Sequence, residues 1–143
     1  MVIAGLPPVG ITAKARGENW DVDSLMNGWH ERWEKRESWT RTVIRDVREW
    51  TNRVYGEVVY YLTQFLSGHG ENASYFHRFG KRPNPSCADC VNLDHPGHVV
   101  LECVRWHARR LVAEVEVGEH LTTETVVPIM LNTRKAGTPC KSW

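Results

Sequence analysis

Apolar residues recur at helical spacing in the first half of the chain. Leu25, Trp29 and Trp33 lie four residues apart, so they share one face of a helix predicted to be capped by Asp23 or Ser24. A second apolar series follows, and its members are Trp39, Val43, Val47, Trp50 and Val54. Because this series keeps a helical step while charged residues fill the other positions, it predicts one continuous amphipathic helix.

Shorter helical patterns follow in the middle of the chain. The apolar residues of segment 57–66 keep a helical step, and Gly68 directly after them is expected to end that helix in a left-handed conformation. Another short helix is predicted around residues 75–79. A basic turn then connects this helix to a group of cysteines and histidines.

The last third of the chain predicts two further helices. Residues 99–117 are expected to form one helix that ends at Gly118, although the alternation in its last five residues also fits a short strand. Thr122 or Thr123 is expected to cap a last short helix that reaches Leu131. The sequence therefore predicts a mainly α fold, a small helical domain with an embedded CCHC zinc-knuckle-like site.

Composition divides the chain into four expected parts. Residues 1–19 carry prolines and glycines without periodicity and are expected to be an extended lead-in. Residues 20–82 form a tryptophan-rich helical region, 83–118 a metal module with its following helix, and 119–143 a short helix with an irregular tail. Five of the seven tryptophans fall in the first fifty residues, and helical spacing favours a core role for them over a binding role. These are Trp20, Trp29, Trp33, Trp39 and Trp50.

Charge and hydropathy limit the classes of protein that fit. The 143 residues contain 18 Lys plus Arg against 17 Asp plus Glu, a formal charge of +1. A role in nucleic-acid binding must therefore rest on local basic patches. Pro7 and Pro8 interrupt the segment in which a signal peptide would need its apolar core, and no run of eighteen apolar residues occurs. We expect an intracellular protein without a membrane partner.

Three cysteines and one histidine fall within seventeen residues and define the candidate site. Cys87, Cys90, His98 and Cys103 have the spacing C-x2-C-x7-H-x4-C. Thiolate and imidazole ligands are those that a structural zinc ion prefers, and two cysteines three residues apart can bind one ion from a single turn. The spacing predicts a closed zinc site in which metal binding stabilises the local fold.

Two alternatives concern the same cluster. His95 gives the spacing C-x2-C-x4-H of the first half of a zinc knuckle, but no cysteine follows it four residues later, so His98 is the favoured ligand. The four cysteines of the chain would also allow three disulfide pairings, but the close spacing with histidines favours a metal. Cys140 remains without an assigned role.

A catalytic interpretation uses some of the same residues. His69 and Glu71, followed by Pro85 and the two nearest cysteines, resemble the H-x-E and P-C-x-x-C elements of zinc nucleobase deaminases. Ser86 interrupts the second element, and few residues are available for the strand expected between the two. The chain carries no other catalytic signature that we recognise. We therefore expect no catalysis by these residues and no small-molecule substrate.

Basic and aromatic residues flank the cysteines on both sides. Such a mixture can contact phosphate and stack on bases of single-stranded nucleic acid, although it also fits a solvated helix face. The aromatic members include Phe79 and Trp106. The candidate nucleic-acid-binding residues are Arg78, Lys81, Arg82, Arg105, Arg109 and Arg110.

Four segments in combination resemble one known family. They are YYLTQFLSGHG at 60–70, YFHRFG at 75–80, CADC at 87–90 and HVVLEC at 98–103. Together with the upstream tryptophans they resemble the C-terminal region of the Pol polyprotein of non-LTR, LINE-type retrotransposons, especially arthropod elements that insert into ribosomal RNA genes. The resemblance covers roughly residues 20–131.

The resemblance implies a function for the parent polyprotein. In that family an endonuclease and an RNA-directed DNA polymerase, the reverse transcriptase, lie upstream and copy element RNA at a nicked chromosomal target. Neither catalytic domain is in these residues. The expected partners are element RNA, target DNA and the upstream reverse transcriptase domain, and the expected place of action is the nucleus. The alternative is a zinc-stabilised protein-interaction module whose tryptophan-rich face docks a protein.

Overall fold

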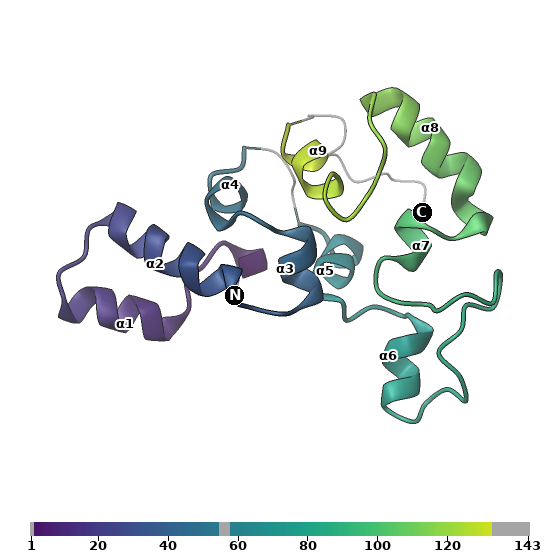
Figure 1. The fold of residues 1–143 in the computed structure, drawn as a ribbon, viewed down its shortest axis with the longest axis horizontal. Coiled ribbons are helices and arrows are strands. Elements are labelled where there is room, and N and C mark those ends of the chain that lie inside the picture. Colours follow the sequence, from purple (N-terminus) through teal and green to yellow (C-terminus); the bar gives the residue numbers. More distant parts are fainter. Residues whose placement is uncertain (1, 55–57, 133–143) are drawn as a thin grey trace.

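The computed structural model describes residues 2–54 and 58–132, and it confirms a mainly α fold in this part of the chain (Figure 1). The only β pairing among the described residues is an isolated bridge between Ser86 and Leu93. The helices are η1 (Val2–Ala4), α1 (Val9–Gly17), α2 (Val22–Glu34), α3 (Trp39–Val43), α4 (Val47–Thr51), α5 (Tyr60–Ser67), α6 (Ala73–Arg78), α7 (His98–Leu101), η2 (Val104–Trp106), α8 (His107–Val117) and α9 (Val126–Asn132).

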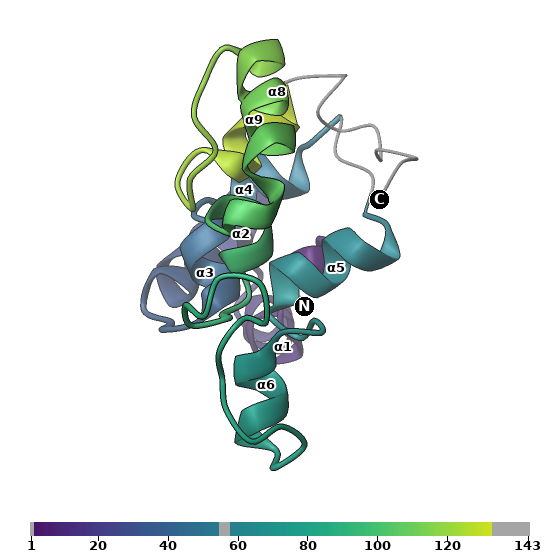
Figure 2. The same cartoon turned by 90° about the vertical axis from the view of Figure 1, so that its right-hand side faces the viewer.

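The helices are arranged along an elongated molecule. Helices α1 and α2 lie at one end, α3, α4, α5 and α9 in the middle, and α6, α7 and α8 at the other end (Figure 1). Helices α6 and α8 extend in opposite directions from the loop that joins α6 to α7 (Figure 2). None of the described helices combines the length and apolar character that a bilayer crossing requires.

The expected extended lead-in is wrong for residues 9–17, which form α1. Ile11 and Ala15 are four residues apart, and both are buried on the side of α1 that packs on α2. Pro8 stands directly before the first helical residue, a place where its fixed φ and missing N–H are tolerated. Two glycines and only two buried positions made this helix hard to recognise from periodicity.

The predicted tryptophan core is confirmed for three of the five tryptophans, whereas Trp20 and Trp39 are only partly buried against it. Trp29, Trp33 and Trp50 are buried, and two of their indole nitrogens bind backbone carbonyls. Trp33 Nε1 donates to Ile44 O at 2.7 Å, and Trp50 Nε1 donates to Ile3 O at 3.2 Å. Each large ring therefore fills core volume while its polar N–H is satisfied.

Helix α2 is confirmed, but its cap is Asp21 and not Asp23 or Ser24. The Asp21 carboxylate accepts from the Ser24 N–H at 2.7 Å. The carboxylate satisfies one of the free N–H groups of the first turn and opposes the positive end of the helix dipole. The helix consequently begins at Val22.

The continuous helix predicted after residue 38 is wrong, because the chain breaks it into α3 and α4. Ile44 leaves the helical region with φ −100° and ψ 88°. The Asp46 carboxylate then accepts from the N–H groups of Arg48 at 2.7 Å and Glu49 at 3.3 Å, which starts a new helix. A short polar side chain that binds nearby N–H groups competes with helix continuation. Val43, Val47 and Trp50 of the predicted apolar series are buried on both sides of the break, but Val54 is exposed.

The left-handed stop at Gly68 and the helix end at Gly118 are confirmed, whereas the long helix over 99–117 is wrong. Gly68 ends α5 with φ 72°, and Gly118 ends α8 with φ 76°. Cys103, with φ −57° and ψ 130°, separates α7 from η2 and α8. The short strand that the alternation allowed is also wrong, because those residues belong to α8.

The last helix closes the core from the far end of the sequence. Val126, Val127 and Met130 of α9 join the core cluster that also contains residues of α2 and α4. The Thr122 hydroxyl accepts from the N–H of Thr125 at 3.2 Å just before α9, which agrees with its predicted capping role. Cys140 and the expected irregular tail lie outside the described residues.

Candidate metal centre

A tight hairpin presents the first two cysteines. Cys87 N–H donates to Asn92 O at 2.8 Å, and Asp94 N–H donates to Pro85 O at 2.9 Å. The turn inside this hairpin closes with Val91 N–H donating to Cys87 O at 3.1 Å, and Val91 adopts a left-handed φ of 64°. A branched residue in this region is uncommon, so the turn is held by its surroundings.

A single helical turn presents the other two side chains. His98 begins α7, and Cys103 N–H donates to His98 O at 2.8 Å as the chain leaves the helix. The side chains of His98 and Cys103 are almost completely buried, and Cys87 is nearly so. The hairpin and the helical turn therefore enclose the site between them.

The four ligand atoms meet at one point. All four lie within 4.8 Å of one another. Cys87 Sγ is 4.0 Å from Cys103 Sγ, close to the separation of about 3.8 Å that two thiolates have on a tetrahedral zinc ion. Cys90 Sγ is 3.1 Å from His98 Nε2, a little less than the roughly 3.6 Å of a shared ion. The arrangement can hold one metal ion with only small shifts.

The thiols differ in acidity. Burial acts to raise the pKa of Cys87, but the N–H groups of Asp89 and Cys90, together with His98, lower it to about 7. Burial raises the pKa of Cys103, and the adjacent Cys87 thiol acts in the same direction. Cys87 is thus prepared as a thiolate, whereas Cys103 must lose its proton when a metal binds.

Glu102 lies behind the histidine ligand. Its carboxylate is 3.6 Å from His98 Nδ1 and 3.0 Å from His95 Nε2, and these three side chains form a second group of close ligand atoms. His98 Nδ1 is buried and has no hydrogen-bond partner at this distance. A carboxylate in this position commonly orients a metal-bound imidazole. A small approach of Glu102 would complete that arrangement.

His95, the alternative ligand, faces away from the thiols. Its Nδ1 accepts from the Gly97 N–H at 3.2 Å, while Nε2 lies against Glu102. It does not belong to the group that contains the three cysteines. This geometry favours His98 as the imidazole of the metal centre.

Two polar contacts attach the hairpin to its neighbours. The buried Asp94 carboxylate accepts from the Ala73 N–H at 2.7 Å, at the first residue of α6. Arg105 Nη1 lies 3.1 Å from the Asp89 carboxylate, which joins the hairpin to the segment after Cys103. The basic turn at 78–82 and the arginine-rich segment at 105–110 are consequently fixed on either side of the site.

The six predicted basic residues have different surroundings. Arg78, Lys81 and Arg82 are exposed, and Arg78 lies 5.3 Å from the Phe79 ring centroid. Arg105 and Arg109 lie 5.1 and 5.3 Å from the Trp106 ring centroid. Arg110, in contrast, is half-buried. Its guanidinium donates to the carbonyls of Val100 and Cys103, each at 3.3 Å, so it supports the segment 87–103 that holds the four candidate ligands, the metal loop.

The histidine and the glutamate of the catalytic interpretation lie outside the cluster of candidate metal ligands. Neither His69 nor Glu71 belongs to either group of close ligand atoms in the described residues. The His69 ring instead packs edge-on against Tyr75, with centroids 5.8 Å apart.

Comparison with family models, curated proteins and solved structures finds no match to this chain.

Sequence reasoning did not identify Glu102 or Asp94 as parts of the site. Glu102 follows His98 by four residues, the spacing that places two side chains on one face of a helical turn, and this signal was available. Asp94 contacts α6, which lies 21 residues earlier, so nothing in its local sequence indicates its role.

Proposed function

We propose that this chain is a zinc-stabilised, nucleic-acid-handling module, the C-terminal segment of a non-LTR retrotransposon Pol polyprotein. Metal binding is supported by one observation: the ligand atoms of three thiols and one imidazole lie within 4.8 Å of one another. Three sulfur ligands and one nitrogen ligand suit zinc better than calcium or magnesium, which bind oxygen. Four protein ligands leave no open position, so the ion has a structural role.

The nucleic-acid part rests on the exposed basic turn and on the family resemblance. Arg78, Lys81 and Arg82 stand at the end of α6, next to Phe79, and are attached through the hairpin to the metal loop. Cations beside an exposed ring can contact phosphate and stack on a base. The partners of this proposal are element RNA and target DNA in the nucleus, with the reverse transcriptase and endonuclease upstream.

Metal removal tests the first part. The full chain, purified with zinc, should contain about one zinc per molecule and should lose helical signal in far-ultraviolet circular dichroism when a strong chelator removes it. Zinc should restore that signal, and magnesium should not. Unchanged helicity after complete chelation would contradict a structural metal.

Charge removal tests the second part. Replacing Arg78, Lys81 and Arg82 with alanine should weaken binding of a single-stranded RNA and reduce its dependence on salt concentration. A matched triple variant removes three exposed cations elsewhere, Arg16, Lys35 and Arg48, and should bind RNA as the unchanged protein does. Equal affinities for the two variants would exclude the basic turn as the binding surface.

A further inference from the structure

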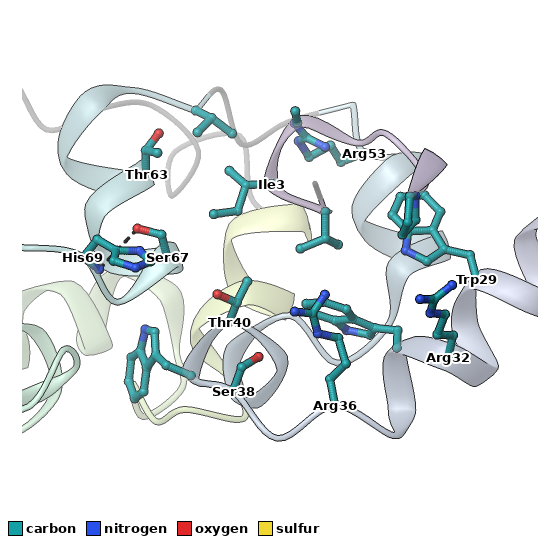
Figure 3. Close-up of a pocket in the computed structure, with 16 residues that line it drawn as sticks. Ile3, Trp29, Arg32, Arg36, Ser38, Thr40, Arg53, Thr63, Ser67 and His69 are labelled. Carbon is teal, nitrogen blue, oxygen red and sulfur yellow. Dashed lines mark hydrogen bonds between the residues drawn. The ribbon is translucent and has the colours of Figure 1, made fainter. Parts of the chain in front are cut away.

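A groove of about 820 Å³ lies where η1, α2, α3 and α5 come together, and its Trp39 end reaches Gly97, next to His98 (Figure 3). Its lining is mostly apolar, with contributions from Ile3, Val58 and the edges of Trp29 and Trp33. This volume is within the range of protein sites that enclose a ligand or an anchoring side chain. Neither the metal centre nor the basic turn uses this surface.

Three arginines surround the apolar lining. Arg32 lies in the last turn of α2 and Arg36 just beyond its end, whereas Arg53 lies on the opposite side and donates through Nη1 to Trp50 O at 2.7 Å (Figure 3). The lining residues include no aspartate or glutamate. Among the described residues, the salt bridges include none to these three arginines. The groove therefore presents positive charge that the described chain does not neutralise.

The aromatic rings of the groove do not suit stacking on nucleic-acid bases. Trp29 and Trp33 are only 2% and 5% exposed, so their faces lie in the core. The third indole, Trp39, is half-buried and packs against Gly68 and Gly97. Single-strand binding needs ring faces that a base can reach. The mostly apolar lining, in contrast, suits apolar side chains of a ligand.

We infer that this groove docks a partner protein through a short acidic segment that carries apolar side chains. Leucine-sized side chains would lie against Ile3 and Val58, and carboxylates would bind the guanidinium groups of Arg32, Arg36 and Arg53. Guanidinium groups recognise carboxylates through paired hydrogen bonds, and an amphipathic segment in an apolar groove is a common mode of peptide recognition. This surface is separate from the proposed nucleic-acid surface.

A defined peptide tests the inference on the full, zinc-loaded chain. The probe is a fluorescent 15-residue peptide of glutamate and leucine in an amphipathic helical pattern, measured by anisotropy. Arg32→Glu with Arg36→Glu should weaken its binding at least about tenfold, because both attractive charges become repulsive. The control, Lys35→Glu with Arg48→Glu, makes the same change in net charge outside the groove and should stay within about twofold.

Two further probes separate the possible occupants. A peptide with lysine in place of glutamate should not bind, and a 15-nucleotide oligouridylate should bind equally well to the groove variant and its control. Arg32→Ala with Arg36→Ala gives a milder loss and serves if the charge-reversed protein shows reduced helicity or zinc content.

Three results would overturn the inference. They are no saturable binding of the acidic peptide, the same loss in the groove variant and its control, and oligouridylate binding that depends on Arg32 and Arg36. The last result would assign the groove to nucleic acid. Failure of the peptide alone would leave the RNA test at Arg78, Lys81 and Arg82 unaffected.

Discussion

The indole ring of Trp39 lies directly against the backbone of Gly97, the residue before His98. A Cβ atom at Gly97 would overlap the ring at Cη2 and lie only 3.1 Å from Cζ2. The other side of the contact is fixed because Trp39 Nε1 donates to Phe65 O at 2.5 Å. A helical residue nearly sixty positions earlier thus packs against the backbone directly before the candidate ligand His98.

Gly97→Ala should destabilise the protein by about 1–3 kcal/mol, the usual cost of an added methyl group in a tightly packed place. The free energy of unfolding, measured with denaturant on the zinc-loaded chain, gives this value. Gly17→Ala is the control, since no atom lies within 4 Å of its added Cβ and its φ is not positive. Equal stabilities for the two variants would show that the Trp39 contact is loose.

His98→Ala should release zinc, whereas His95→Ala should retain it. Removing one of four ligands opens the site, but the His95 ring nitrogens are engaged with Gly97 and Glu102. Zinc per chain after gel filtration measures both. The opposite pattern would assign the metal to His95.

Glu102→Gln should lower zinc affinity by about 10- to 100-fold without removing a ligand, because an outer carboxylate orients the bound imidazole. Competition with a chelator of known affinity measures the change. Glu116→Gln removes an exposed carboxylate from α8 and should leave the affinity unchanged. If the two variants behave alike, the 3.6 Å approach to His98 has no role in binding.

Zinc affinity should fall as the solution becomes more acidic. Zinc binds thiolates, and protons compete for Cys87 once the pH drops below its pKa of about 7. Cys103, whose pKa burial raises, carries its proton already at neutral pH and must release it on binding. Chelator competition at several pH values between about 5 and 8 should therefore show affinity increasing with pH. A constant affinity across this range would contradict thiolate ligation.

Local features of the fold and site could be predicted from the sequence. The four candidate ligands lie within seventeen residues, so their spacing alone indicated that they meet. Gly68 and Gly118 ended helices as expected because a left-handed residue needs no distant partner. The buried tryptophans followed from helical periodicity.

Features that depend on competition or on distant contacts could not be predicted. Asp46 and Cys103 interrupt apolar series that otherwise keep a helical step, the first by binding backbone N–H groups and the second by turning toward the other thiols. Helix α1 has little apolar surface of its own and depends on packing against α2. The exposure of Leu111 and Val115 on α8 also contradicts the simple assumption that an apolar position is buried.

The metal loop stands in the middle of the chain, between two groups of residues that share one core. Leu66 precedes the loop, Val126 and Val127 follow it, and all three belong to the same buried cluster. Folding must therefore bring together chain segments separated by a long connection, and the entropy lost in doing so increases with the length of free chain. An ion that joins Cys87 to Cys103 shortens that free chain before the core closes. Zinc would then lower the entropy cost of packing α9 against α3 and α4, although the ion contacts none of these helices.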